Sequence, residues 1–494
     1  MKLSYETPQD GTVRDWVDYR AQSDEIAFVF AEDNRTLNWS DLRDEAAKIA
    51  RAITAQGIAK GESIAILQPN GREGVLAFYG AVYGGFRATM INLAAGRDAI
   101  AYALDHCEAR IALVHDSVSD MFESARPEKM TRLSSFTENA VELHNVSSSD
   151  HALLMYTSGT TGRPKGVVHT QSSLLAGGWA PTVAHRLTDE DRALCVLPIC
   201  HINGLCVTVM GALVSGGSVA MVEKFSASRF WNQIKTHEAT WFSVVPTIIS
   251  HLLHSDTNPD EQSKSRLRFG RSASSALAPD VQTAFETRFG LPIIETMGLT
   301  ETAAQILSNP LPPGTRKIGS PGIAYGNEVI ILATDQSECK AGVEGEIAIR
   351  GPNVMLEYLK NPDATQSTFH GRWLRTGDLG RKDVDGYLFV TGRLKELIIK
   401  GGENIAPREI DEALYAHGDV VEAAAFARPC KTYGERVEAA VRVCEGSSLT
   451  AEELIAICVE KLGKFKAPDQ VHFLPELPKG PSGKIQRLKL QEIL

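Results

Sequence analysis

The sequence predicts an α/β fold with a large N-terminal domain of βαβ-type parallel sheets, a distorted antiparallel, barrel-like part, and a small α+β C-terminal domain. Three observations indicate this. Short apolar strands alternate with amphipathic helices over the first 120 residues, strands separated by Gly/Asp turns follow residue 328, and a new α+β pattern starts after Gly392. The 494 residues, 43% apolar and 23% charged, exclude a disordered or fibrous protein.

The N-terminal elements follow from the spacing of apolar residues. Ser40 is expected to cap a helix that ends at Gly57, because Leu42, Ala46 and Ile49 recur on one helical face. After it the pattern predicts a strand over 63–67, a helix from about 75, a strand over 89–93, a helix near 100–104 and a strand over 110–114. Strands that are apolar throughout are typical of parallel sheets covered on both faces.

The same alternation continues to about residue 245 and then changes. Strands are expected over 195–198, 219–222 and 240–245, and antiparallel strands over 328–332, 345–350 and 386–390. The apolar run over 204–222 contains Gly, Ser and Thr, so we expect a buried helix and strand rather than a membrane span. A domain boundary at Gly392 divides the chain into residues 1–392 and 393–494.

Charge and cysteine content restrict the partners and the compartment. With 51 Lys+Arg against 61 Asp+Glu the net charge is −10, which argues against nucleic acid or an anionic membrane as the main partner. The N-terminal residues contain no basic stretch followed by an apolar one, so no signal peptide is expected. Eight cysteines without a CxxC pair are interpreted as reduced, buried thiols of a cytoplasmic protein.

The segment over 156–166 has the composition of a polyphosphate site. It follows an apolar strand over 152–155 and supplies four Ser and Thr hydroxyls, three glycines and two cations, Arg163 and Lys165. Glycines let backbone N–H groups approach phosphate, hydroxyls donate to its oxygens, and the cations balance its charge. The Walker loop does not fit, because Lys165 lies six residues after Gly159 and follows Pro164.

This segment resembles the phosphate-binding signature of the AMP-forming acyl-CoA synthetases, within the adenylate-forming ligases. Five further segments resemble signatures of that family in the same order: Gly298–Glu301, Arg375–Asp378, Gly392–Glu396, Gly401–Asn404 and Pro481–Lys484. The six segments are spread in order over more than 300 residues, so chance agreement is excluded. The resemblance implies a ligase that uses ATP, Mg²⁺ and CoA.

The resemblance also implies roles in the adenylation of a carboxylic acid. Thr300 would contact the α-phosphate, Glu301 would hold Mg²⁺, and Asp378 with Arg393 would bind the ribose. Lys484 would bridge the carboxylate and the α-phosphate as a catalytic group. Met297 stands where the family commonly has an aromatic residue against adenine. The remaining ATP-binding residues implied are Thr157, Ser158, Gly159, Thr160, Thr161, Gly162, Lys165, Ser274, Ser275 and Gly298.

In the second half-reaction a thiol attacks the acyl-adenylate. The family rotates its small mobile domain about a hinge, here Lys395, which exchanges Lys484 for the loop of Gly401, Gly402 and Asn404. Small residues in that loop would leave a tunnel for pantetheine. Phe465 and Lys466 are placed near the CoA nucleotide by the same resemblance, although Lys-Phe-Lys is equally typical of an exposed helix edge.

The acid is expected to be small and to carry a second anionic or polar group. The middle of the chain is similar to the branch that contains oxalate–CoA ligases, and His201 and Ser274 stand where that branch lines its acid pocket. A fatty chain would leave such polar groups unpaired. That branch has a histidine where this chain has Ala304, which favours a bulkier second anion, as in malonate or sulfoacetate, over oxalate.

Three alternatives stay open at this stage: a medium-chain or aryl acid–CoA ligase, an adenylate-forming enzyme that does not use CoA, and a catalytically silent binding protein. A structural histidine at a helix start is the alternative for His201. Expected partners are the acid, ATP and CoA, without nucleic acid or membrane insertion, and a homodimer is left open.

Overall fold

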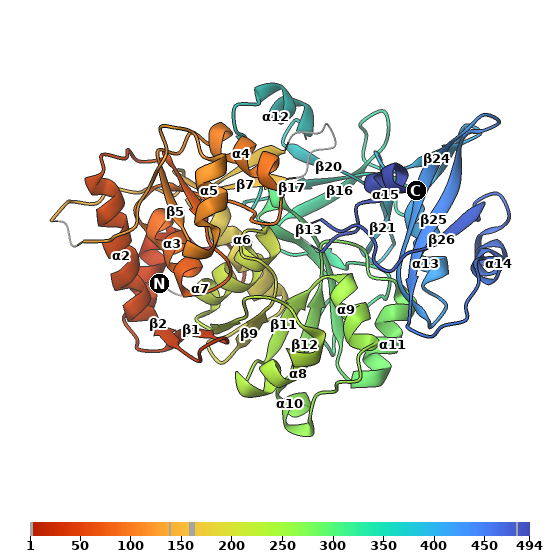
Figure 1. The fold of residues 1–494 in the computed structure, drawn as a ribbon, viewed down its shortest axis with the longest axis horizontal. Helices are drawn as coiled ribbons and strands as arrows, with labels where there is room; N and C mark the ends of the chain where they lie inside the picture. The colour runs from red at the N-terminus through yellow and green to blue at the C-terminus, as the bar shows by residue number, and fades with distance from the viewer. Residues whose placement is uncertain (1–2, 138–139, 158–163, 481–482) are drawn as a thin grey trace.

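The computed structural model describes residues 3–137, 140–157, 164–480 and 483–494. Helices and strands of the N-terminal part fill one end of the molecule, and the strands nearest the C-terminus form the opposite end (Figure 1). Among the described residues the strands form four sheets. None of the described helices is long and apolar enough to cross a membrane.

The largest sheet has a parallel centre and antiparallel edges. Its order is β15-β14-β13-β12-β11-β9-β10-β1-β2, and the pairs from β13 to β1 are parallel. Ser272 ends β12 and Thr300 directly follows β13, so these two polar residues lie at the carboxyl ends of neighbouring strands. The strands are β1 (Ile26–Phe30), β2 (Thr36–Asn38), β9 (Arg192–Cys195), β10 (Ser218–Met221), β11 (Trp241–Val244), β12 (Phe269–Ser272), β13 (Ile293–Leu299), β14 (Ala304–Ser308) and β15 (Ile323–Ala324).

A second sheet repeats this design and ends in an antiparallel edge. Its order is β18-β8-β7-β4-β3-β5-β6, in which β7, β4, β3, β5 and β6 are parallel. The strands β8 and β18 add to it in antiparallel orientation. The bounds are β3 (Ser63–Leu67), β4 (Arg87–Met90), β5 (Ile111–Val114), β6 (Thr131–Arg132), β7 (His151–Thr157), β8 (Lys165–Thr170) and β18 (Glu357–Tyr358).

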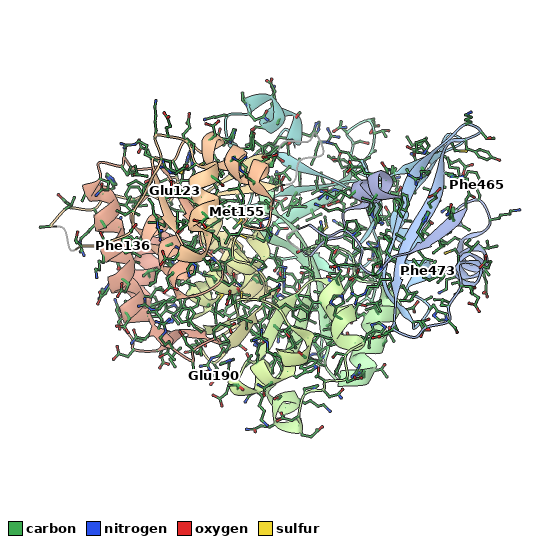
Figure 2. All side chains as sticks on the ribbon, in the orientation of Figure 1. Glu123, Phe136, Met155, Glu190, Phe465 and Phe473 are labelled. Atoms are coloured by element: carbon green, nitrogen blue, oxygen red, sulfur yellow. The ribbon has the colours of Figure 1, made fainter. Side chains whose placement is uncertain are left out.

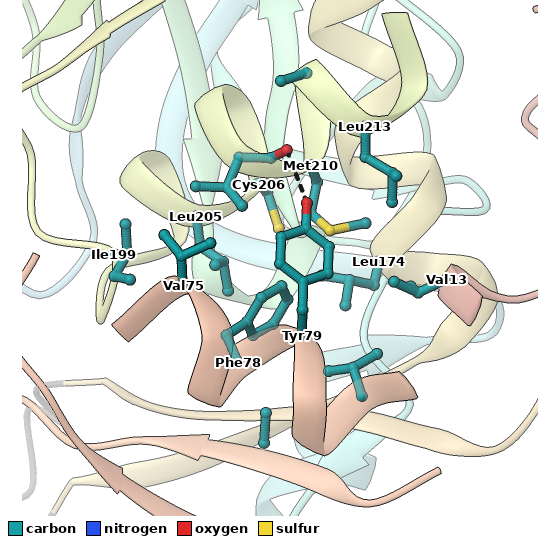
Figure 3. Close-up of a cluster of buried hydrophobic side chains, with 14 of the residues drawn as sticks. Val13, Val75, Phe78, Tyr79, Leu174, Ile199, Leu205, Cys206, Met210 and Leu213 are labelled. Atoms are coloured by element: carbon teal, nitrogen blue, oxygen red, sulfur yellow. Dashed lines mark hydrogen bonds between the residues drawn. The ribbon is translucent and has the colours of Figure 1, made fainter. Parts of the chain in front are cut away.

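Helices buried between the two sheets join them into one core. Phe28 of β1, Ile64 of β3 and Tyr79 of α3 belong to the same buried cluster. Figure 3 shows Tyr79 next to the π-helical segment η2, where its hydroxyl donates to the carbonyl of Val209 over 3.3 Å. The helical segments before the antiparallel part are α1 (Val13–Arg20), α2 (Trp39–Ala55), α3 (Arg72–Tyr83), α4 (Arg97–His106), η1 (Asp116–Val118), α5 (Ser119–Ala125), α6 (Gln171–Ala184), η2 (Asn203–Met210), α7 (Gly211–Ser215), α8 (Ala227–Thr236), α9 (Pro246–Leu253), α10 (Glu261–Arg266), α11 (Pro279–Phe289) and η3 (Thr300–Thr302).

A five-stranded antiparallel sheet follows, as the sequence predicts. The long strand β20 (Trp373–Lys382) pairs with β17 (Gly345–Arg350), with β19 (Phe369–His370) and with β21 (Leu388–Arg393), while β16 (Glu328–Leu332) borders β17. The helix α12 (Pro362–Thr368) precedes β19. The sheet places the ends of β20 and β21 next to the last part of the chain.

The last hundred residues form their own sheet and their own buried cluster. The order is β23-β22-β25-β24, with β26 parallel to β25. Ile398, Phe426 and Val441 are buried in this part. Its elements are β22 (Ile398–Lys400), β23 (Glu403–Ile405), α13 (Pro407–Leu414), β24 (Val420–Cys430), β25 (Gly434–Val443), α14 (Ala451–Leu462), β26 (Gln470–Phe473) and α15 (Arg487–Ile493).

Several predicted boundaries are wrong by a few residues. Asn38, not Ser40, caps α2, because Asn38 has extended backbone and its side chain accepts from the N–H of Asp41 at 2.7 Å. The strand expected at 89–93 is β4 at 87–90, since Asn92 begins a turn. The strand expected at 195–198 is β9, which ends at Cys195 before Pro198, a residue without a ladder donor.

The prediction of buried thiols is half right. All eight cysteines are free, and Cys107, Cys195, Cys206 and Cys458 are buried. The other four are partly exposed: Cys200, Cys339, Cys430 and Cys444. The run over 204–222 is the buried helix and strand that its composition predicts, with a π-helical first part.

Candidate active site

Lys165 and Glu301 lie on either side of Tyr358. The Lys165 Nζ atom is 4.5 Å from the centre of the Tyr358 ring, and the Tyr358 hydroxyl donates to Glu301 Oε1 at 2.8 Å. Tyr358 belongs to β18, whose pairing with β8 brings it there. Burial and the Glu301 charge raise the pKa of Tyr358, so its hydroxyl stays a donor. A cation and a carboxylate are therefore fixed about one aromatic ring.

The turn that carries Thr300 and Glu301 is held from two sides. Gly298 precedes it at a point where a Cβ would lie 1.6 Å from the carbonyl oxygen of Ala304, so only glycine fits. His169 of β8 donates from Nε2 to the Thr300 carbonyl at 2.7 Å, and burial lowers the pKa of His169 to about 4. A neutral imidazole thus fixes the backbone at Thr300.

Asp378 and Arg393 face each other across neighbouring strands. They are register partners on β20 and β21, and Arg393 Nε lies 3.2 Å from Asp378 Oδ1. Burial raises the pKa of Asp378, while the Arg393 and Lys484 charges lower it. The pair places a two-oxygen acceptor beside a cation at the edge of the antiparallel sheet.

Lys484 reaches this edge from the C-terminal part. Burial, then the Arg393 charge, lowers the pKa of Lys484, and the carboxylates of Asp378, Glu396 and Glu301 oppose that shift. The Thr247 hydroxyl at the start of α9 donates to the carbonyl of the neighbouring Gly483 at 3.3 Å. The structure therefore brings the predicted catalytic lysine to the same place as Glu301 and Asp378.

A buried guanidinium lies among neutral polar groups beneath the loop with Ser274. Arg271 at the end of β12 is 1% exposed. Its Nη1 donates to Asn203 Oδ1 and to Ser243 Oγ, both at 2.9 Å, and its Nε donates to Gln305 at 3.2 Å. Burial lowers the pKa of Arg271 to about 9. None of the ion pairs found among the described residues includes Arg271.

One of the predicted acid-binding residues, Ser274, is linked to Arg271 through Asn203. Asn203 Nδ2 donates to Ser274 Oγ at 3.3 Å, and Ser274 has a left-handed backbone with φ of 76°. His201 is half-buried, and its backbone carbonyl accepts from the N–H of Leu205 at the start of the helix. Ser275 is exposed and Met297 is half-buried at the end of β13.

The residues predicted to contact CoA lie on two turns of the C-terminal part. Gly401 and Gly402 link β22 to β23 with φ of 61° and 88°, and Asn404 is exposed. Lys400 Nζ donates to the carbonyl of Phe465 at 2.9 Å, which joins this turn to the one after α14. Phe465 is 40% exposed and lies at the outer end of the C-terminal part (Figure 2). Since α14 ends at Leu462, the Lys-Phe-Lys segment is a turn and not a helix edge.

Three further predicted residues lie in the described parts of the chain. Lys466 donates to Glu409 at 2.7 Å. Lys395 is exposed in the turn between β21 and β22, which is the connection between the antiparallel sheet and the C-terminal sheet. Thr157 ends β7 as the register partner of Lys165. Ser158, Gly159, Thr160, Thr161 and Gly162 lie outside the described residues, as do Arg163, Pro481 and Ser482.

One carboxylate is the protein's contribution to a cation site here. No group of three or more His, Cys, Asp or Glu side chains within the described ranges could hold a metal ion. Tyr358 orients one oxygen of Glu301, and Mg²⁺ fits a single carboxylate because it keeps water and substrate phosphates as its other ligands. The site thus suits a magnesium ion that arrives with a polyphosphate.

Sequence reasoning missed the polar residues that orient the others. Asn203, Ser243 and Gln305 hold Arg271, and Tyr358 holds Glu301. The sequence could have indicated Asn203, Ser243 and Gln305, because each is a polar residue inside an apolar strand or helix. Tyr358 carries no such signal, since its place depends on the pairing of two distant strands.

Comparison with known families finds two matches along the chain. Residues 15–359 match the model of the AMP-binding enzymes, and residues 409–484 match the C-terminal domain of the AMP-binding enzymes. These two ranges contain the site residues described above, except those in the connection at 360–408.

Individual proteins agree with this over nearly the whole chain. A sulfoacetate–CoA ligase of Cupriavidus necator is 43% identical over 95% of both chains, and an oxalate–CoA ligase of Arabidopsis thaliana is 36% identical over 90% of this chain and 91% of its own. The structure of an o-succinylbenzoate coenzyme A synthetase from Bacillus subtilis, in complex with ATP and magnesium ion, superposes with a TM-score of 0.85 at 29% identity, over 98% of this chain and 100% of its own.

Proposed function

Since the chain belongs to the family of AMP-binding enzymes and is an AMP-forming acid–CoA ligase, we propose that it activates a short acid carrying a second negative charge. Malonate and sulfoacetate are acids of this kind. ATP and CoA are the other substrates, and Mg²⁺ accompanies ATP, as in the similar synthetase structure. Medium-chain and aryl acids are the alternative substrates, because CoA ligases for 2-succinylbenzoate are also 32% identical to the chain.

One observation carries this proposal. The Arg271 guanidinium is buried and bonded to neutral partners, so its charge is not compensated by any carboxylate contact among the described residues. An isolated buried charge costs several kcal/mol unless a counter-ion reaches it. An acid whose second anionic group enters the pocket beside Asn203 and Ser274 would supply that counter-ion. An alkyl chain there would leave both charge and hydroxyls unpaired.

The first half-reaction needs two anions to meet. A carboxylate oxygen of the acid attacks the α-phosphorus of ATP, and the bond from that phosphorus to the pyrophosphate oxygen breaks. Lys165 and Lys484 reduce the repulsion, Thr300 donates to the α-phosphate, and Asp378 accepts from the ribose hydroxyls. Glu301 would hold Mg²⁺, which supplies charge neutralisation to the phosphates when bound. His201 and Ser274 orient the acid.

The second half-reaction uses the same acyl-adenylate with other residues. We place the pantetheine thiol beside Gly401, Gly402 and Asn404, and the nucleotide of CoA beside Phe465 and Lys466. The described orientation has Lys484 near Asp378 and the glycine turn exposed, which suits adenylation. Rotation of residues 393–494 about Lys395 would exchange the two, with residues 1–392 as the fixed domain.

The remaining assignments concern the cell and the assembly. We place the enzyme in the cytoplasm, where its eight free thiols would stay reduced. A homodimer is the assembly we propose to test by light scattering. Neither assignment affects the reaction.

Mass spectrometry of the products tests the proposed reaction. With ATP, Mg²⁺, CoA and malonate or sulfoacetate, we expect AMP, pyrophosphate and the acyl-CoA thioester in equal amounts. Pyrophosphate release without thioester from every acid would contradict the CoA-ligase assignment. Thioester from alkyl or aryl acids alone would contradict only the proposed acid class.

A further inference from the structure

One face of α9 is a polar stripe directed at the C-terminal part. Thr247, Ser250, His251 and His254 follow each other at the spacing i, i+3, i+4, i+7, which places them on one side of a helix. The opposite side, with Ile248, Ile249 and Leu252, is buried in the apolar core. Because that core belongs to the N-terminal part, packing against it fixes α9 with its polar side chains facing the C-terminal part.

Each residue of the stripe contacts the C-terminal part. Thr247 donates to the Gly483 carbonyl at 3.3 Å, Ser250 donates to the Val421 carbonyl at 2.6 Å, and His254 Nε2 lies 3.1 Å from the Gly418 carbonyl. His251 Nε2 lies 3.0 Å from Glu422 Oε1. The stripe therefore spans from the neighbour of Lys484 to the start of β24.

Glu422 links the stripe to the segment that carries Lys484. Its side chain is 0% exposed, and Lys479 Nζ lies 2.8 Å from the same Oε1 that His251 contacts. The N–H of Leu477 donates to Oε2 at 3.4 Å. The contacts of His251 and Lys479 lower the pKa of Glu422 to about 2 against the effect of burial, so the carboxylate stays charged.

Lys479 in turn sets the position of Lys484. It forms a β-bridge with Ile485, Gly480 donates from its backbone N–H to the Lys484 carbonyl at 2.7 Å, and Gly483 donates to Gly480 at 2.9 Å. The residues on either side of Lys484 are thus held to Lys479 and to the adjacent Gly480, and Lys479 is held to Glu422. A shift of Glu422 would move the lysine.

The charges around His251 decide how it bonds. Arg442 Nη1 lies 3.4 Å from His251 Nε2 and 3.7 Å from Glu422. Because Nε2 cannot accept from Arg442 while it donates to Glu422, we assign the shorter contact, with Nε2 as donor. Lys479 and Arg442 already balance the carboxylate, so His251 needs to supply only a hydrogen bond.

We propose that His251 is a positioning residue for adenylation, which through Glu422 and Lys479 holds Lys484 at the adenylation site. The inference rests on the two-orientation reaction proposed above. In the first half-reaction the link from His251 through Glu422 to Lys479 would hold Lys484 in place, and this link would break before CoA reacts. A loss of this link should therefore affect one half-reaction only.

Five variants test the link: His251→Ala, His251→Gln, Lys479→Met, the double variant of His251→Ala with Lys479→Met and, as the matched control, His254→Ala. The control loses a contact of the same kind that does not reach Glu422. Adenylation is followed as acid-dependent exchange of pyrophosphate into ATP without CoA. Thioester formation is followed from supplied acyl-adenylate and CoA, with the acid that the unmodified enzyme uses fastest. Thermal unfolding confirms that each variant is folded.

We expect His251→Ala and Lys479→Met to lower exchange about tenfold each, with no further loss in the double variant, because both act through Glu422. Thioester formation should stay within twofold. His251→Gln should restore most of the exchange, since its amide can donate to Glu422, and His254→Ala should keep it.

Unchanged exchange in His251→Ala, or an equal loss in His254→Ala, would overturn the inference. So would an equal loss in both half-reactions. Failure of the proposed function is recognised separately, because the unmodified enzyme would then form no thioester from the acyl-adenylate.

Discussion

Arg271 Nη1 donates to the side-chain oxygen of Asn203 over 2.9 Å, and this bond turns the Asn203 amide nitrogen toward Ser274, 3.3 Å away. Ser243 also donates to the Asn203 oxygen at 3.1 Å, so the orientation of the amide is fixed twice. The buried charge of Arg271 is thereby linked to the polar side chains of Asn203 and Ser274, where the acid pocket is predicted. This arrangement of a cation and polar groups suits the second anionic group of an acid.

Arg271→Gln should weaken the binding of the acid. Loss of a hydrogen-bonded charge of this kind costs about 1.5–3 kcal/mol, which is a ten- to hundredfold rise in KM for the acid. KM for ATP should change less than threefold, because Arg271 donates to Asn203, Ser243 and Gln305, none of which is a predicted phosphate ligand. Steady-state kinetics with each substrate varied checks this. A rise that is equal for both substrates would indicate a general loss of structure.

Lys484→Ala should abolish adenylation and spare the second half-reaction. The ammonium group and its position are both lost, which we expect to lower the rate of pyrophosphate exchange by about 10²–10³, roughly 3–4 kcal/mol. Thioester formation from supplied acyl-adenylate should persist, since Lys484 serves only the first step. An equal loss in both assays would contradict the exchange of residues between half-reactions.

Gly402→Leu should have the opposite effect. Nothing lies within 4 Å of a Cβ at this position, but its φ of 88° strains any side chain, so Gly402→Ala serves as the control for backbone strain. Adenylation should continue in both variants, and thioester formation should fall much further in the leucine variant, which would fill the pantetheine path. Equal thioester rates in the two variants would show that the turn does not line that path.

Glu422→Gln should lower stability in a pH-dependent way. The pKa of Glu422 is about 2 in the folded protein and 4.5 as the ordinary value, so the folded state binds fewer protons between these values. The stabilisation is present above pH 4.5 and is lost as the pH falls toward 2; about 2.5 units correspond to roughly 3 kcal/mol. Urea unfolding of both forms at pH 7, 5 and 3.5 should give a difference that shrinks below pH 4.5. A difference independent of pH would contradict the ionic contacts assigned to Glu422.

The sequence predicts the elements well where one local pattern decides them. The strands over 63–67, 328–332 and 345–350 have the predicted bounds, since each is an apolar run between turn residues. The prediction misplaced the cap at Asn38 and the end of β9. Neighbouring residues such as Asn38 and Ser40 can both cap a helix, and the backbone conformation of the folded chain decides which of them does.

The site residues, like the helices and strands, were predicted where a local sequence motif identifies them. Motifs in the sequence indicated Lys484, Asp378 and Arg393, which the structure brings together. The polar stripe on α9 is visible in the sequence as Thr247, Ser250, His251 and His254, but its partner Glu422 lies 171 residues beyond His251. Such long-range pairs depend on how two sheets meet, and no local spacing encodes that.

The central claim is that the acid carries a second negative charge, and the kcat/KM for thioester formation with a panel of acids tests it most directly. The panel contains sulfoacetate, malonate, oxalate, acetate, hexanoate and benzoate at equal ATP and CoA. We predict that sulfoacetate or malonate exceeds hexanoate and benzoate at least tenfold, since each polar group left unpaired costs roughly 1–3 kcal/mol. Oxalate should not be the best, because Ala304 supplies no donor. A higher kcat/KM for hexanoate or benzoate than for every short dianionic acid would contradict the account.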